Sequence, residues 1–180
     1  MLLLLALLPF LYPGQSGKFV RVNATNEISL SIPANFILLP DNAVFERHGH
    51  YRAPVAFYTD PTGEIDLSIS QNVSRWRQED IEIYKDFYKA NILSLYDDAE
   101  FSKEEIKDVR GQQFAVFEFI STLREDEKSF RGPTALRKYT YIMYTVYKET
   151  TLIYNFTSDA KTKNQWSPVA NEIMEGIALK

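Results

Sequence analysis

The sequence contains no cysteine and only two histidines, and these shortages exclude several classes of function. Without cysteine the chain forms no disulfide, thiol nucleophile, zinc–thiolate site or lipidated N-terminal cysteine. The strings Gly-x-Ser-x-Gly and Gly-x-Gly-x-x-Gly and the phosphate-binding P-loop string are absent as well. Since no catalytic or cofactor signature is visible, we predict a non-enzymatic protein with no cofactor and no bound metal.

The sequence also lacks a strong excess of either charge, because it has 20 Lys and Arg residues and 24 Asp and Glu residues, for a net charge of -4. The basic residues are scattered among acidic ones, as in Arg75–Asp80, and form no basic stripe. We therefore predict no nucleic-acid partner. The 180 residues, 45% of them hydrophobic, are enough for one domain with a full core.

The longest apolar run is at the N-terminus, Met1–Tyr12. It is too short to span a bilayer, which needs about 20 apolar residues. Its length suits the core of a signal peptide, although a positive start is missing and the first basic residue is Lys18. The alternative is a buried N-terminal strand or helix. We predict a signal peptide over residues 1–17, a periplasmic or secreted protein without a stable membrane anchor, and a single domain over residues 18–180.

The chain is organised around Leu136–Thr157, which predicts two long β-strands folded back on each other. Aromatic and β-branched residues alternate there with a period of two, as in packed strands. One face of the first strand carries Tyr139, Tyr141, Met143, Thr145 and Tyr147, and the other carries Thr140, Ile142, Tyr144 and Val146. Neither face is clearly polar, so we expect both to be covered, with a helix on each side.

The remaining pattern predicts helices over residues 77–96 and from Ser167-Pro168 onward, with Pro168 at the first helical position or in the first turn of a slightly longer helix. Strands are predicted at 19–22, 28–32, 55–58, 64–70 and 112–123. Residues 36–39 are expected to pack on the core in an extended form. We expect an irregular segment over Asp41–Arg52, a short strand or turn around Phe101, and a long charged connection over Arg124–Thr134.

This order of elements resembles the Mog1/PsbP-like superfamily, which includes the bacterial PsbP-related and DcrB-like exported proteins. The resemblance is carried by Ile28–Pro33, by the helix with Asn91–Leu95 and by the closing strand Thr151–Thr157, followed by an amphipathic helix. It covers about residues 19–180 and rests on pattern, without a catalytic signature. It implies an α+β fold in which an antiparallel sheet of about six or seven strands lies between helices.

The resemblance also implies an exported accessory or binding protein that acts on another protein or complex. No residue carries over the partner of any member. Many exported relatives are lipoproteins, and the absence of cysteine departs from that pattern. The oligomeric state and the identity of the partner are left open by the sequence.

Candidate contact residues come from the two polar connections and from the tyrosine-rich strand. Long polar connections are where such a scaffold varies. The first connection contains His48 and His50, which could also supply two metal ligands, although an exposed polar loop explains them more simply. The second contains Arg131. We predict weak ligand or partner contacts for Tyr139, Tyr141, Tyr147, His48, His50 and Arg131.

Two alternative functions can be tested against a structure. A small-ligand carrier would have an apolar cavity between the sheet and a helix, beside Tyr139, Tyr141 or Tyr147. A hydrolase would have a histidine within hydrogen-bond reach of a carboxylate and a nucleophile. Glu118, on a predicted strand, is the candidate general acid or base. The simpler interpretation of Glu118 is a strand position near an edge of the sheet, or pairing with Arg137 or Lys138 from the neighbouring strand.

Overall fold

The structure, a computed structural model, describes residues 17–48, 53–124 and 135–180. Its helices are α1 (Asp41–His48), α2 (Ile81–Leu95) and α3 (Lys163–Glu175), with 3₁₀ turns η1 (Gln78–Asp80) and η2 (Ala160–Thr162). Its strands are β1 (Phe19–Asn23), β2 (Ile28–Pro33), β3 (Ile37–Leu38), β4 (Ala56–Thr59), β5 (Asp66–Val73), β6 (Asp98–Val109), β7 (Gln112–Arg124), β8 (Ala135–Tyr147), β9 (Thr150–Asp159) and β10 (Ala178–Leu179). Within these residues no helix is long and apolar enough to cross a membrane.

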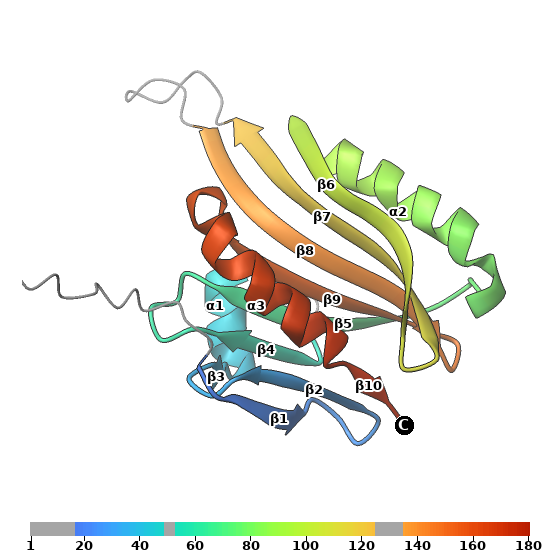
Figure 1. Ribbon diagram of the computed structural model, residues 1–180, viewed down its shortest axis with the longest axis horizontal. Helices are drawn as coiled ribbons and strands as arrows, with labels where there is room; N and C mark the ends of the chain where they lie inside the picture. Colours follow the sequence, from blue (N-terminus) through green and yellow to red (C-terminus); the bar gives the residue numbers. More distant parts are fainter. Residues whose placement is uncertain (1–16, 49–52, 125–134) are drawn as a thin grey trace, which may run out of the picture.

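Seven strands form one antiparallel sheet in the order β3-β4-β5-β9-β8-β7-β6 (Figure 1). The predicted α+β fold with an antiparallel sheet between helices is confirmed. The other strands form a small antiparallel sheet, β1-β2-β10, that the sequence did not predict as a separate unit. The strand pair at the start of the domain thus belongs to a different sheet from the long strands.

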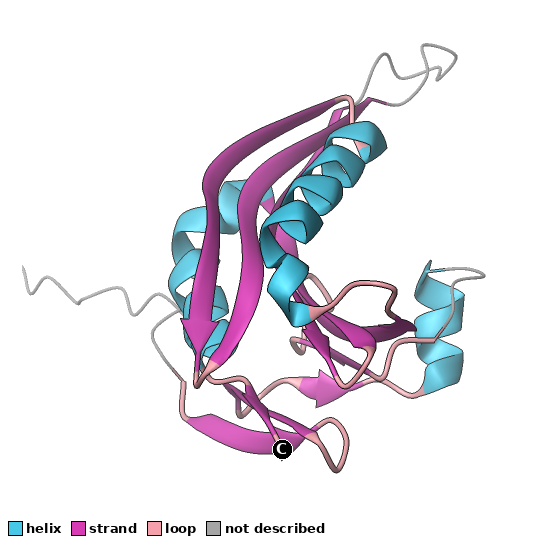
Figure 2. Ribbon diagram, turned by 90° about the vertical axis from the view of Figure 1, so that its right-hand side faces the viewer, coloured by secondary structure: helices cyan, strands magenta, loops and turns pink. Residues whose placement is uncertain are grey.

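The β8–β9 hairpin lies in the middle of the large sheet, and its two faces belong to two different cores. On one face, Tyr139, Tyr141 and Met143 pack in the cluster that contains Ile173 and Met174 of α3. On the other face, buried side chains of β8 pack with those of α2, among them Tyr144, Val146, Ile81, Tyr84 and Ile92. Figure 2 shows α2 and α3 on opposite sides of the long strands. The predicted cover of both faces by a helix on each side is therefore present.

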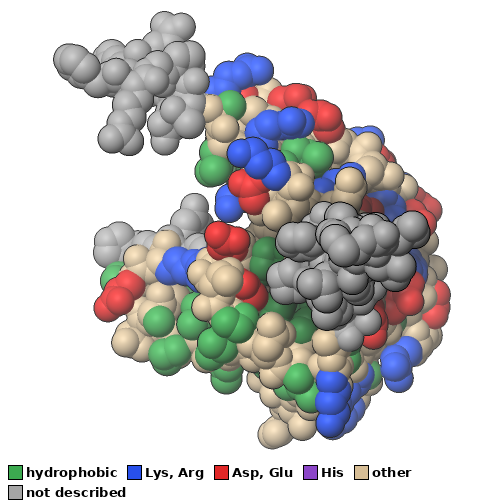
Figure 3. Space-filling model, turned by 60° about the vertical axis from the view of Figure 1, so that its left-hand side comes forward, with side chains coloured by type: hydrophobic (Ala, Val, Ile, Leu, Met, Phe, Trp, Pro, Cys, Tyr) green, Lys and Arg blue, Asp and Glu red, His purple; other side chains and the backbone are tan. Residues whose placement is uncertain are grey.

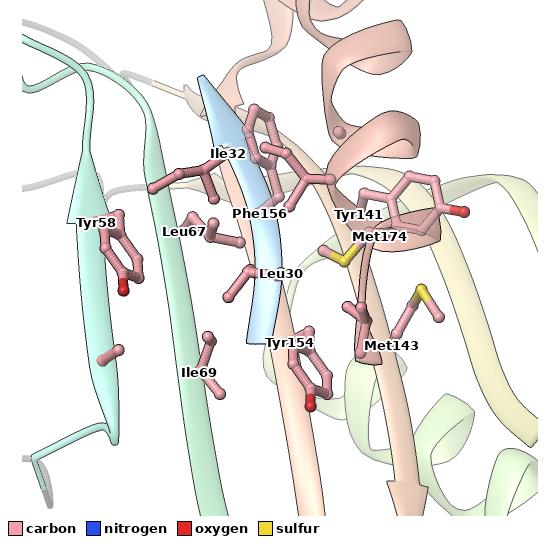
Figure 4. Close-up of a cluster of buried hydrophobic side chains, with 14 of the residues drawn as sticks. Leu30, Ile32, Tyr58, Leu67, Ile69, Tyr141, Met143, Tyr154, Phe156 and Met174 are labelled. Carbon is pink, nitrogen blue, oxygen red and sulfur yellow. The ribbon is translucent and has the colours of Figure 1, made fainter. Parts of the chain in front are cut away.

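The small sheet completes the core on the α3 side. Leu30 is fully buried, and Figure 4 shows the side chains of β2 lying against those of β5 and β9. The residues labelled there on these strands are Leu30 and Ile32 of β2, Leu67 and Ile69 of β5, and Tyr154 and Phe156 of β9. Gly176 lets the chain pass close to β2 on its way from α3 into β10, because a Cβ there would lie 3.2 Å from the backbone nitrogen of Ser31. The C-terminus is thus built into the fold as an edge of the small sheet.

Two segments are more regular than the sequence predicted: residues 41–48, expected to be irregular, and the region of Phe101, expected to be a short strand or turn. Residues 41–48 form helix α1, held by the buried side chain of Val44 and by N–H groups that bond the carbonyl oxygen of Pro40. Strand β6 is twelve residues long, and seven of these are charged, which hid its alternation. Because β6 is the edge of the large sheet, those charges protect it from pairing with another chain.

Two further expectations were wrong in detail. Ile37 and Leu38 are 51% and 58% exposed, so within residues 36–39 the first of the four, Phe36, is the one that joins the core. Helix α3 begins at Lys163, four residues before Ser167, and Pro168 lies inside it. Since proline has no N–H, the carbonyl group of Asn164 loses its usual helical donor. The 3₁₀ turn η2 immediately before α3 extends this helical segment backwards.

The turn between β4 and β5 is organised by Asp60. Its carboxylate accepts hydrogen bonds from the backbone N–H groups of Glu64 and Ile65, both at 2.9 Å, and of Thr62 at 3.2 Å. Gly63 has a φ of 73°, which glycine adopts without steric cost. Burial of the carboxyl group would raise its pKa, but the hydrogen bonds from Thr62, Ile65 and Glu64 outweigh burial and hold the pKa of Asp60 below its ordinary value.

We predict that Asp60→Ala lowers the free energy of unfolding at neutral pH by roughly 1–3 kcal/mol, because buried N–H groups lose their acceptor. A lowered folded-state pKa means that the part of the contribution linked to ionisation is present above the unfolded carboxyl pKa of about 3.9 and is lost as the pH falls through the folded value. Denaturant unfolding at neutral and acidic pH measures both effects. The exposed Glu64→Gln in the same turn is the control, and an equal loss in that variant would contradict the prediction.

Candidate functional site

Tyr139 and Tyr141 project from β8 toward α3 and are 0% and 1% exposed. The ring of Tyr139 packs edge-on against Phe156, with centroids 6.4 Å apart. Its hydroxyl donates a hydrogen bond to Glu118 at 3.0 Å, and the hydroxyl of Tyr141 lies 3.5 Å from the side-chain oxygen of Asn171. The structure therefore places both tyrosines in the packed layer between the sheet and α3. Their predicted part in ligand or partner contact remains a prediction.

Charged side chains surround these two rings on the α3 side. Lys103 of β6 lies 3.9 Å from the carboxylate of Glu118 and 5.1 Å from the ring centre of Tyr141. Lys163 of α3 lies 5.8 Å from the ring centre of Tyr139. Glu118 is thus paired with Lys103 and Tyr139, and Arg137 pairs with Glu100 instead. Glu118 lies on β7, next to the edge strand β6, as the other simple interpretation expected. Figure 3 shows basic and acidic side chains interspersed on one face of the molecule, without a large area of one sign.

The phenol groups of this layer are held neutral. Burial raises the pKa of Tyr139, and the nearby negative charge of Glu118 raises it further. Burial followed by the charge of Glu118 does the same for Tyr141, and burial is the first cause for Tyr144 on the opposite face. A phenol with a raised pKa stays protonated, so the hydroxyl of Tyr139 can donate its hydrogen bond to the carboxylate of Glu118.

Tyr147, at the other end of β8, lies beside the end of the chain. Its hydroxyl donates a hydrogen bond to the carbonyl oxygen of Lys180, and the same oxygen accepts from the amino group of Lys148 at 3.1 Å. Lys148 also forms an ion pair with Glu27 at 2.6 Å. These contacts fix the position of β10 next to Tyr147. A pocket of about 330 Å³ lies at this place, lined by Tyr147, β10 and the β6–β7 turn.

The other predicted contact residues are described only in part. His48 is the last residue of α1, while His50 and Arg131 lie outside the described residues. The structure therefore does not test the two histidines as a ligand pair. Within the described ranges, no group of three or more His, Cys, Asp or Glu residues could hold a metal ion.

Helix α2 has an exposed apolar face that the sequence analysis missed. Ile83 and Phe87 are 61% and 46% exposed, and they lie one turn apart on the outer side of the helix. Ala90 and Ser94 continue the same stripe without a charge, because residues at i, i+4, i+7 and i+11 share a helix face. In Figure 2 no other element lies in front of α2. The signal in the sequence is the pair Ile83 and Phe87, two apolar residues four positions apart. They lie outside the buried side of the helix, which is formed by Ile81, Tyr84 and Ile92.

An aromatic and basic segment adjoins this stripe. Trp76, just before η1, packs against Phe87 with ring centroids 5.6 Å apart. Arg75 and Arg77 on either side of it are exposed. Arg77 lies 3.4 Å from Glu79, whereas Arg75 has no ion pair among the described residues. We call Arg75, Trp76, Arg77, Ile83 and Phe87 the α2 surface.

Comparison with known proteins gives the class of the fold. No protein-family profile matches the sequence, and no curated protein sequence matches it. Solved structures do match over almost the whole chain, and they have the Mog1/PsbP-like fold. The predicted resemblance is therefore confirmed at the level of fold.

Three of these structures illustrate the likeness. The cyanobacterial PsbP (CyanoP) of Synechocystis sp. PCC 6803 has 14% identity and a TM-score of 0.60, covering 96% of this chain and 99% of its own. The Ran-binding protein Mog1p of Saccharomyces cerevisiae has 11% identity and a TM-score of 0.57, covering 91% and 96%. LpqN of Mycobacterium tuberculosis, involved in cell envelope biogenesis, has 13% identity and a TM-score of 0.55, covering 91% of each chain. Identities this low establish the fold and nothing further.

We predict that the buried tyrosines ionise only when the protein unfolds in alkali. Burial raises the pKa of Tyr84, Tyr139, Tyr141, Tyr144 and Tyr154. Because each folded-state pKa lies above the unfolded value of about 10, their stabilising effect is complete below that pH and is lost as the pH rises further. Phenolate absorbance and circular dichroism should therefore change together.

Tyr144→Phe is the matched variant, and it should remove one phenolate from the cooperative alkaline step. Gradual ionisation of all the tyrosines near their ordinary pKa, with circular dichroism unchanged, would show that these rings are accessible in the folded protein.

Proposed function

We propose that this protein is an exported, non-catalytic binding protein that acts on another protein through the α2 surface. The observation that carries the proposal is the exposed stripe of Ile83 and Phe87 beside Trp76. Apolar side chains that group on a surface mark interaction sites more often than single exposed ones do. Tryptophan, other aromatic residues and arginine are also the residues enriched in the buried centres of protein interfaces.

The chemistry of the α2 surface defines its partner. An apolar side chain of the partner would lie over Ile83 and Phe87, and carboxylates would reach Arg75 and Arg77. Arginine binds carboxylates through two parallel hydrogen bonds, which gives such a contact a defined orientation. Arg75 is available for this role because no acidic side chain of the described residues is paired with it. We therefore propose a protein partner with an acidic, partly apolar segment.

The structural neighbours support a binding role. One of them is described as a Ran-binding protein, and another as involved in cell envelope biogenesis. Export is supported by the apolar run at residues 1–12, which we propose to be part of a signal peptide ending at residue 17. The mature single domain would then be residues 18–180, in the periplasm or outside the cell. The contacts predicted for His48, His50 and Arg131 remain part of this proposal.

We predict that Ile83→Ser combined with Phe87→Ser lowers capture of the partner at least about tenfold, as expected for central interface residues. Both side chains are exposed, so the loss of stability should stay near 1 kcal/mol, mostly from the Phe87–Trp76 contact. The measurement is capture of host proteins by the affinity-tagged chain expressed in its host, quantified by mass spectrometry. Thermal unfolding of each variant reports its folding.

Leu38→Ser is the matched control, because Leu38 is equally exposed but lies on β3, in another part of the sheet. It should capture the same partner as the unchanged chain. The proposal fails if the double variant is folded and captures every protein that the control captures.

One observation favours a second candidate function, the small-ligand carrier. That hypothesis requires a cavity beside Tyr139, Tyr141 or Tyr147. The rings of Tyr139 and Tyr141 are closely packed, but Tyr147 lines a pocket of about 330 Å³. This size is at the lower end of ligand-binding pockets.

A further inference from the structure

We infer that the pocket beside Tyr147 binds a small amphipathic carboxylate, with its apolar part against Tyr147 and Leu179 and its carboxylate on Arg110. This inference rests on the second candidate function and is independent of the α2 surface. The pocket lies where the β6–β7 turn meets β10 and the end of β8. In Figure 1 these three parts of the chain lie close together near the C-terminus.

The floor of the pocket is apolar and well packed. Val109, Phe114 and Ile177 line it and are 7%, 0% and 1% exposed, and Leu179 of β10 adds a further apolar side. A volume of about 330 Å³ is roughly that of ten water molecules in the liquid. A ligand of that size has an apolar body of about six carbons and a single head group. The accessible apolar surface comes from Tyr147, Ala178 and Leu179, which line the pocket and are half-buried. Covering these side chains removes apolar surface from water, which provides the non-specific part of the affinity.

The rim of the pocket carries an unpaired cation. Arg110 is exposed and lines the pocket, and its guanidinium has no ion pair or hydrogen bond among the described residues. Asp108, two residues earlier near the end of β6, uses its carboxylate to accept a hydrogen bond from the backbone N–H of Gly111 at 2.9 Å. A guanidinium beside an apolar floor fits a ligand with a carboxylate at one end. This charge complementarity selects an anion over a neutral or cationic ligand.

The backbone of Arg110 supports a functional role for its side chain. Arg110 has a φ of 57° and Gly111 a φ of 83°, so both residues of this two-residue turn are in the left-handed region. Asparagine or glycine is preferred at the first of these positions, because a residue with a Cβ and a long side chain is strained there. Strained residues gather at functional sites. The arginine thus holds a position that another residue would occupy more favourably.

The wall of the pocket is fixed in advance. The amide nitrogen of Gln112 donates to Gln78 and to Thr145, each at 2.7 Å, which holds the Gln112 side chain in one orientation. Tyr147 is held by its hydrogen bond to the carbonyl oxygen of Lys180. A pre-formed pocket binds with a smaller loss of conformational freedom than one that must close around its ligand.

The test is a titration of the purified protein with hexanoate, hexan-1-ol and hexylamine, followed by amide chemical shifts in two-dimensional NMR spectra. We expect hexanoate to shift the amides of the β6–β7 turn and of β10. It should bind about tenfold or more tightly than hexan-1-ol, as expected for a charge-assisted hydrogen bond. Hexylamine should bind more weakly still, because it places a like charge beside Arg110.

Arg110→Asn separates binding from stability. It should remove the preference for hexanoate over hexan-1-ol and raise the melting temperature by about 2–4 °C, because it relieves the strained turn. Glu149→Gly is the matched control, since Glu149 has a φ of 60° in the neighbouring β8–β9 turn and does not line this pocket. It should raise the melting temperature similarly and leave hexanoate binding unchanged.

Three results would overturn the inference. The first is equal binding of hexanoate and hexan-1-ol, and the second is unchanged hexanoate binding in Arg110→Asn. The third is loss of partner capture in Arg110→Asn when hexanoate causes no shifts at the pocket, which would assign the pocket to a protein interface. Because the α2 surface is tested by Ile83 and Phe87, failure of one proposal can be told from failure of the other.

Discussion

The β8–β9 hairpin must be shielded from water on both faces, and the rest of the fold serves this requirement. One face carries Tyr139, Tyr141 and Met143, and the other carries Tyr144 and Val146, all of them buried. Residues of these types cannot stay exposed without a large cost in hydration free energy. Helix α2 covers one face, while α3 and the small β1-β2-β10 sheet cover the other. The helices are thus required by the strands they cover.

This constraint also determines where binding can take place. When both faces of a sheet are covered by the core, its central strands have little exposed surface that a partner or ligand can reach. The exposed apolar side chains and the pocket that we propose as binding sites therefore lie at the periphery. They are on the outer side of α2 and at the end of the sheet near Tyr147. The raised pKa values of Tyr139 and Tyr141 have the same origin, because burial under α3 disfavours the charged phenolate.

The fold could be predicted from the sequence where alternation was strong. The two long strands and the helix over residues 77–96 follow from residue periodicity alone. Strand β6 was predicted only as a short strand or turn around Phe101, because the charges that protect an edge strand also hide the alternation over its full length. The short helix α1 has too few apolar residues to show a period, and its stability comes from tertiary packing of Val44.

The candidate sites were predicted less well, for a physical reason. Tyr139, Tyr141 and Tyr147 alternate along one strand face, so the sequence treats them alike. Burial separates them, because α3 covers the first two and the strand end leaves Tyr147 beside a pocket. The pocket at Arg110 depends on β10, which comes from the far end of the sequence and pairs with β2 in the small sheet. Contacts of this kind are set by topology and leave no local signal.

The most direct test of this account is native-state hydrogen exchange of the amides in β8 and β9. If both faces of the hairpin are covered, these amides exchange only through global unfolding, with the full free energy of unfolding, while the outer turns exchange earlier. Exchange of the central β8 amides, around Tyr139 and Tyr141, through a local opening of much lower free energy would contradict the account. It would mean that α3 leaves the sheet readily and that the buried tyrosines are accessible to a ligand.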